Sequence, residues 1–130
     1  MNAAALSAYQ QNSIDTASPA RLIVMLYEGV VTALDKTAAA LSTPVDIELA
    51  HRELTRCQDI VVELMQALNH DAGEMAIRLA RLYEYCHHQL VQANATKDFS
   101  HAQPVRDIFA DLRGVWTEIA ESGSVERVSA

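Results

Sequence analysis

The sequence predicts an all-α fold, an antiparallel up-down four-helix bundle with a short apolar N-terminal arm or helix. The chain has 130 residues, a length typical of one domain. Alanine, the best helix former, occurs 21 times, whereas 4 glycines and 3 prolines supply too few turns for a many-stranded β fold. Apolar residues with helical spacing also recur in four long segments. Together these features favour a bundle that buries its own core.

The starts of the four helices are predicted from prolines and from one polar break. Ser18-Pro19 and Thr43-Pro44 each place a capping hydroxyl before a proline, which lacks the N–H that the first turn leaves unpaired. Gln103-Pro104 marks a third start, and a fourth is expected near Ala72-Gly73, with Asp71 as its cap. The expected units are an arm over residues 1–16, the bundle over residues 17–121 and a flexible tail over residues 122–130.

Each expected helix carries apolar side chains at intervals of three and four residues, the spacing of one helix face. The links between the helices are short, which implies that neighbouring helices are antiparallel. The predicted apolar stripes are Leu22, Leu26, Val30, Leu34, Ala38 and Leu41; Ile47, Ala50, Leu54, Cys57, Val61, Leu64 and Leu68; Met75, Leu79, Leu82, Cys86, Leu90 and Ala93; and Val105, Ile108, Phe109, Leu112, Trp116 and Ile119.

Charge and cysteine content exclude several classes of function. The net charge of −7 and the absence of a basic run argue against nucleic acid as a partner, because phosphate must be neutralised. No apolar run approaches the length of a membrane-spanning helix, so no membrane insertion is expected. Cys57 and Cys86 stand alone, which leaves open buried thiols or a single disulfide and favours a cytoplasmic protein.

Two Glu-x-x-His sequences give the strongest pattern for catalysis. Glu48 and His51 lie on the second expected helix, and Glu84 and His87 lie on the third. In di-metal bundle enzymes this spacing directs a carboxylate and an imidazole from each helix toward shared metal ions. The four residues flank the apolar stripes, however, so a solvated face is the favoured interpretation and the di-metal enzyme is the alternative.

Gly29 and the tyrosines at positions 27, 83 and 85 have two interpretations. Glycine inside a helix costs about 1 kcal/mol relative to alanine, so Gly29 indicates close helix packing or the floor of a groove. Tyrosine has an apolar ring and a polar tip, which suits a groove as well as a core. Periodicity favours the core, and both interpretations stay open.

Two sequence blocks then suggest a family. Residues 9–11 (Tyr-Gln-Gln), 16–19 (Thr-Ala-Ser-Pro) and 22–29 (Leu-Ile-Val-Met-Leu-Tyr-Glu-Gly) resemble the opening of the flagellin export chaperones, the FliS family. Residues 82–85 (Leu-Tyr-Glu-Tyr) and 89–94 (Gln-Leu-Val-Gln-Ala-Asn), with Trp116, resemble its second half. The resemblance covers about residues 6–120. The chain departs from the family at Ala72, where a glycine is frequent, and at His87-His88, where two basic residues are usual.

This resemblance implies a cytoplasmic chaperone that is not an enzyme and needs no cofactor. Family members are antiparallel four-helix bundles that bind the disordered C-terminal segment of flagellin. They prevent its premature polymerisation and deliver it to the flagellar export gate, which is a second partner. Whether the free protein is a monomer or a homodimer stays open.

The resemblance also implies a set of site residues. Leu6 and Tyr9 match family positions associated with capping of an apolar cleft and with docking at the export gate. The residues expected to bind flagellin, with these two, are Met25, Tyr27, Gly29, Leu82, Tyr83, Leu90 and Asn94.

Overall fold

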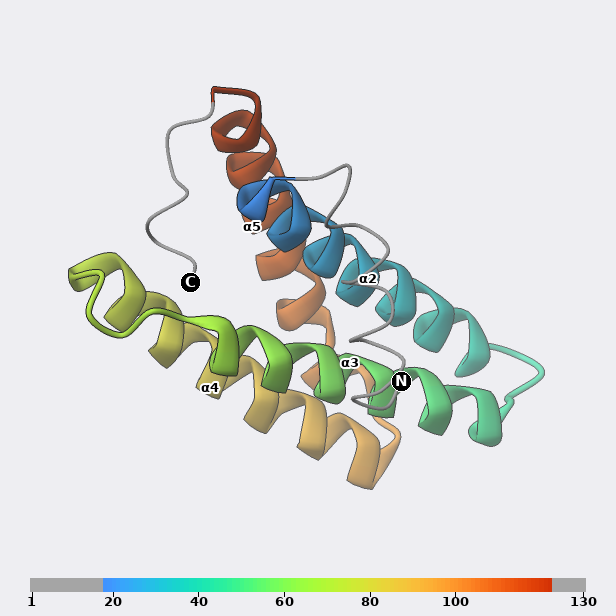
Figure 1. Cartoon of the computed structure of the whole chain (residues 1–130). Helices are drawn as coiled ribbons and strands as arrows, with labels where there is room; N and C mark the ends of the chain where they lie inside the picture. Colours follow the sequence, from blue (N-terminus) through green and yellow to red (C-terminus); the bar gives the residue numbers. More distant parts are fainter. Residues whose placement is uncertain (1–17, 123–130) are drawn as a thin grey trace.

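The computed structural model describes residues 18–122 and confirms the all-α fold (Figure 1). Four α-helices run through this part of the chain, and one 3₁₀ turn connects the last two. The elements are α2 (Pro19–Ala40), α3 (Ile47–Ala67), α4 (Glu74–Thr96), η1 (Phe99–His101) and α5 (Gln103–Ser122). The predicted arm over residues 1–16, with Leu6 and Tyr9, lies outside the described residues, as does the tail beyond Ser122.

The start of α2 is as predicted, whereas that of α3 is not. Ser18 Oγ accepts a hydrogen bond from the Arg21 amide at 3.2 Å, and Pro19 is the first helical residue. Thr43-Pro44 does not open α3. Asp46 caps it instead, with Oδ1 accepting from the Leu49 amide at 3.0 Å, because a carboxylate in extended backbone is a strong N-cap. The second helix therefore begins at Ile47.

Helix α4 begins at Glu74, next to the predicted Ala72-Gly73, but the predicted Asp71 cap is wrong. Its N-cap is Gly73 at φ 101°, a conformation that favours glycine, and no side chain caps this helix. The Asp71 amide donates to Asn69 Oδ1 at 3.1 Å, so this stretch forms a local turn before the helix. The fourth helix begins at Gln103, one residue before Pro104, after the 3₁₀ turn that Asp98 caps.

Helix α2 occupies the centre of the bundle. It packs against α3 on one side and α5 on the other, and α3 also packs against α4. Figure 1 shows α2, α3 and α4 side by side in alternating directions, with α5 crossing α2 at a steep angle. Helices α4 and α5 contact each other sparsely and are joined mainly through η1. The bundle is therefore asymmetric, and α4 diverges from α5.

The core contains most of the predicted stripes. Residues buried from α3 include Leu54, Cys57, Val61 and Leu64, as the periodicity predicts. Ile47 and Met75 were expected in the stripes but are about half exposed, at 49% and 50%. Each lies in the first turn of its helix. None of the four described helices has the length and apolar character needed to cross a membrane.

Candidate functional site

An aromatic cluster joins α2, α4 and α5 at the centre of the molecule. The ring of Tyr27 lies edge-on to Phe109 and Trp116, with centroids 5.5 Å and 6.2 Å away. Tyr83 of α4 stacks on Phe109 of α5, with centroids 6.2 Å apart and 7° between the planes. The hydroxyls of Tyr27 and Tyr83 share a hydrogen bond of 2.6 Å. The cluster fixes the middle of α4 to the other two helices.

Tyr27 and Tyr83 are therefore core residues in this structure. Tyr27 is 0% exposed and Tyr83 is 2% exposed, so neither ring offers a surface to a partner in this conformation. Burial raises the pKa of the Tyr83 phenol to about 12, and it also raises the pKa of Tyr27. Both side chains stay neutral under physiological conditions, and the core interpretation of the tyrosines is the one the geometry favours.

The other expected contact residues also lie mostly within the packing of the bundle. Leu90 is fully buried, whereas Met25 and Leu82 are half-buried. A Cβ on Gly29 would lie 3.2 Å from Ile60 Cδ1, which identifies this glycine as a point of close approach between α2 and α3. That any of these residues contacts a partner stays a prediction.

Asn94 is occupied by contacts within the bundle. Its amide nitrogen donates to Gln58 Oε1 at 2.8 Å, and its Oδ1 lies 3.0 Å from His51 Nδ1. Lys97 Nζ also donates to this Oδ1 at 2.6 Å, at the left-handed residue that ends α4. This side chain is among those expected to bind flagellin. In this structure it holds the end of α4 against α3.

The di-metal alternative requires four side chains to face the core, and the structure does not place them there. Glu48, His51 and Glu84 are exposed and His87 is half-buried, so the four side chains do not converge in the core. His51 lies beside Asn94, whereas His87 lies beside the second half of α3. Within residues 18–122, no three His, Cys, Asp or Glu side chains are arranged to hold a metal ion. Cys57 and Cys86 are free, buried thiols.

The edge of α4 that faces away from α3 is apolar and exposed. Ala80, Glu84 and His87 lie toward α3, because they line a depression together with α3 side chains. Met75, Leu82 and Tyr85 lie on the opposite edge of α4, at intervals of seven and three residues. Met75 and Tyr85 are 50% and 46% exposed, and Leu82 is half-buried. This edge faces the side on which α4 diverges from α5.

Helix α5 presents a matching edge. Arg106 forms an ion pair with Asp35 of α2 at 3.0 Å, which defines the side of α5 that faces α2. Leu112, Val115 and Ile119 follow one another at intervals of three and four residues on the other side. Val115 is 54% exposed, and the other two are half-buried. We name the two edges together the α4–α5 apolar face: Met75, Leu82, Tyr85, Leu112, Val115 and Ile119.

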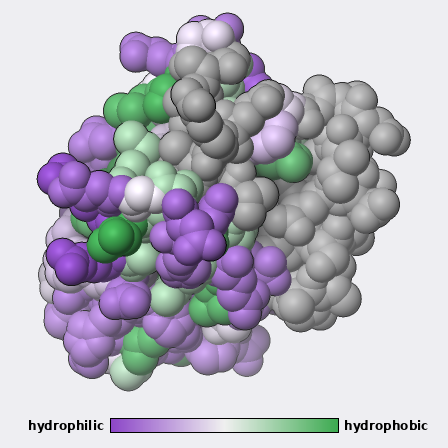
Figure 2. Space-filling view, turned by 60° about the vertical axis from the view of Figure 1, so that its left-hand side comes forward, coloured by the Kyte–Doolittle hydropathy of each residue, from purple (hydrophilic) through white to green (hydrophobic). Residues whose placement is uncertain are grey.

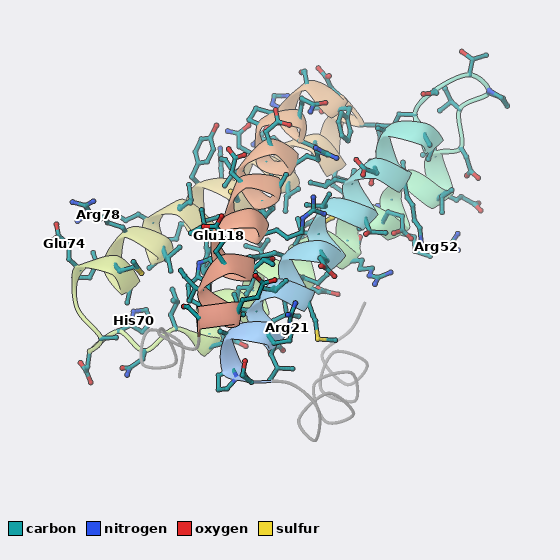
Figure 3. The ribbon with its side chains drawn as sticks, turned by 90° about the horizontal axis from the view of Figure 1, so that it is seen from above. Arg21, Arg52, His70, Glu74, Arg78 and Glu118 are labelled. Carbon is teal, nitrogen blue, oxygen red and sulfur yellow. The ribbon has the colours of Figure 1, made fainter. Side chains whose placement is uncertain are left out.

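Charged groups border the α4–α5 apolar face. Arg78 pairs with Glu74 at 3.0 Å, and both side chains are well exposed. Figure 3 shows these two residues projecting from the start of α4, with Glu118 on α5. Figure 2 shows the side of the molecule that carries the start of α4. Hydrophobic side chains form a broken band there between hydrophilic ones. Apolar side chains within a polar rim are typical of a surface that binds a partner.

The sequence predicts only part of this face. Leu82 is a predicted binding residue as well as a stripe residue, and Tyr85 is a candidate for a groove. Met75, Leu112 and Ile119 belong only to the predicted core stripes, and Val115 belongs to neither set. The signal for Val115 was its place three residues after Leu112 and four before Ile119. A helix with an apolar stripe wider than its core contact requires is expected to have a second partner.

Comparison with known proteins agrees with the fold and the earlier resemblance. The family model described as flagellar protein FliS matches residues 1–123. The flagellar secretion chaperone FliS of Bacillus subtilis is 33% identical over 121 residues, covering 93% of this chain and 90% of the relative. The FliS chaperones of Vibrio cholerae and Salmonella typhimurium are 29% and 28% identical, covering 88% and 95% of this chain and 87% and 96% of those relatives. The chain belongs to the FliS family of flagellar proteins.

Proposed function

We propose that this protein is a cytoplasmic flagellar export chaperone that binds the disordered C-terminal segment of flagellin. It keeps flagellin from polymerising prematurely and delivers it to the export gate. The observation that carries the proposal is the α4–α5 apolar face on a chain of the FliS family. Binding alone accounts for this activity, so no catalytic group is required.

The physical basis of binding is the burial of two apolar surfaces against each other. The terminal segment of flagellin packs as an amphipathic helix in the filament, so it exposes an apolar face when it is alone. A helix laid between Leu82 and Tyr85 of α4 and Val115 of α5 would bury that face in the helix-in-groove mode. Ordering the disordered segment opposes binding by about 2–5 kcal/mol. The free energy gained by burying apolar surface must exceed this cost.

The arm over residues 1–16 has a role in this proposal. We propose that it covers apolar surface of the free chaperone through Leu6 and Tyr9 and that flagellin displaces it. A tethered segment acts at an effective concentration of about millimolar, so weak docking is sufficient to shield the surface. The same two residues are proposed to contact the export gate once they are released.

Isothermal titration with a flagellin C-terminal fragment of about forty residues tests the function. We expect saturable one-to-one binding with a negative heat-capacity change, because apolar surface is buried. Val115→Asp places a charge on the α4–α5 apolar face and is expected to weaken binding by about tenfold or more. Val45→Asp is the matched control, since Val45 is similarly exposed, at 57%, in the link before α3.

Each outcome of the titration decides a separate point. If both valine variants bind flagellin as the parent does, the α4–α5 apolar face is not the site, although the chaperone function stands. If the parent chain does not bind the fragment, with the arm present or deleted, the proposed function is wrong.

A further inference from the structure

A second surface lies on the opposite edge of α4, away from the α4–α5 apolar face. Side chains of α3, of α4 and of the link between them enclose a shallow depression of about 390 Å³. We name it the α3–α4 depression. It is lined by Val62, Met65, Gln66, His70, Ala80, Glu84 and His87. A smaller hollow of about 170 Å³ on α3 shares Val62 and Gln66 with it and adds Asp59 and Glu63.

The floor of the depression is apolar. Val62 and Met65 of α3 and Ala80 of α4 are each half-buried, although they lie between two packed helices. Met65 and Ala80 pack against the hydrophobic core, so the floor is fixed in place. Two antiparallel helices with a furrow between them present the geometry into which a third helix packs. The depression therefore suits an apolar side chain carried on a helix.

The depression and the hollow beside it carry three carboxylates, and the imidazoles of His70 and His87 also line the depression. Glu84 lines the depression on the α4 side, and Asp59 and Glu63 line the hollow that continues it along α3. None of the residues that line the two hollows is lysine or arginine. Figure 3 shows His70 at the same end of the molecule as Glu74 and Arg78. Carboxylates around an apolar floor complement cations set beside apolar side chains.

We infer that the α3–α4 depression docks a cationic amphipathic helix of a partner protein. The partner presents leucine-like side chains to Val62, Met65 and Ala80, and its lysines or arginines pair with Glu63 and Glu84. Because this surface and the α4–α5 apolar face lie on opposite edges of α4, both can be occupied at once. The inference stands independently of flagellin binding and adds a second partner to the same bundle.

The probe is a synthetic helical peptide of leucine and lysine, about eighteen residues or five turns long, with its leucines on one face. Binding to the full chain is measured by calorimetry, and the contact is mapped by amide chemical shifts. We expect the largest shifts within residues 59–66 and 80–87. The variant E63Q/E84Q is expected to bind about fivefold more weakly, the loss typical of two ion pairs at the protein surface.

The matched control is E28Q/E121Q, which removes the same charge from exposed positions on α2 and α5. It is expected to change the affinity less than about twofold, and thermal melting checks that each variant is folded. Equal losses in the two variants would overturn the inference, as would the largest shifts falling on residues 112–119. So would equally tight binding of a peptide with alanine in place of leucine, which would show attraction of charge alone. Absence of binding also overturns it.

Discussion

The buried hydroxyl pair of Tyr27 and Tyr83 makes a sharp prediction about stability. Two phenolic protons meet there, but one hydrogen bond of 2.6 Å accounts for only one of them. Within residues 18–122, neither hydroxyl has another hydrogen-bond partner. Removing a single hydroxyl therefore leaves the other buried without a partner, whereas removing both leaves an all-apolar contact among the aromatic rings.

The magnitudes follow from this geometry. Tyr27→Phe or Tyr83→Phe alone is expected to lower the free energy of unfolding by about 1–3 kcal/mol, the penalty for an unsatisfied buried polar group. The double variant removes both hydroxyls and is expected to lose less than about 1 kcal/mol. The coupling energy of the double-mutant cycle is then about 1 kcal/mol or more and opposite in sign to the single losses.

Urea denaturation followed by tryptophan fluorescence measures these values, because Trp116 is the single tryptophan and lies 6.2 Å from the Tyr27 ring. Tyr85→Phe is the control, since this tyrosine is 46% exposed, and its loss is expected to stay within about 0.5 kcal/mol. If the double variant loses the sum of the two single losses, the hydroxyls do not depend on each other and the reasoning is refuted.

Three further predictions follow from other features. Gly114→Ala should raise the free energy of unfolding by about 1 kcal/mol, because the added Cβ lies in open space on a helix. Gly29→Ala should raise the free energy of unfolding by less, because the added Cβ lies close to Ile60. Urea denaturation compares the two variants. Burial raises the pKa of Tyr83 from 10.0 to about 12. The free energy of unfolding should therefore fall as the pH rises from about 10 to 12, because the phenol ionises in the unfolded chain before it does in the folded one. Near-ultraviolet absorbance should show that this tyrosine ionises at a higher pH than an exposed tyrosine. Deleting residues 1–14 should raise the fluorescence of a hydrophobic dye and leave flagellin binding intact or stronger; unchanged dye fluorescence would count against a covering arm.

Local chemistry was sufficient to predict the fold but not every helix boundary. Ser18-Pro19 has the hydroxyl and the ring that a first turn needs, and α2 begins there. Thr43-Pro44 offers the same signal, yet Asp46 three residues later supplies the cap that α3 uses. When two residues could each cap a helix, packing against the neighbouring helices decides which one does, and the local sequence does not show that packing.

The site was harder to predict because its determinants are not local. Tyr27 and Tyr83 are 56 residues apart, and only tertiary packing brings their hydroxyls together. Nothing near Asn94 in the sequence indicates a hydrogen-bond partner, but its side chain is hydrogen-bonded to Gln58 on α3. The divergence of α4 from α5 depends on a crossing angle, which the spacing of apolar residues within each helix does not specify. The stripes therefore included residues that turned out to be half-exposed.

The aromatic cluster explains how one helix can be both firmly held and open to a partner. Asn94 and Gln58 fix the end of α4 to α3, and Tyr83 fixes its middle to α2 and α5. Between its N-terminus and Tyr83, α4 stays packed against α3 while α5 diverges from it. The bundle therefore covers Met75 and Leu82 only in part. Because the fixed part of α4 holds these side chains in place, a partner helix would bind a surface that is already ordered and would itself bear most of the ordering cost.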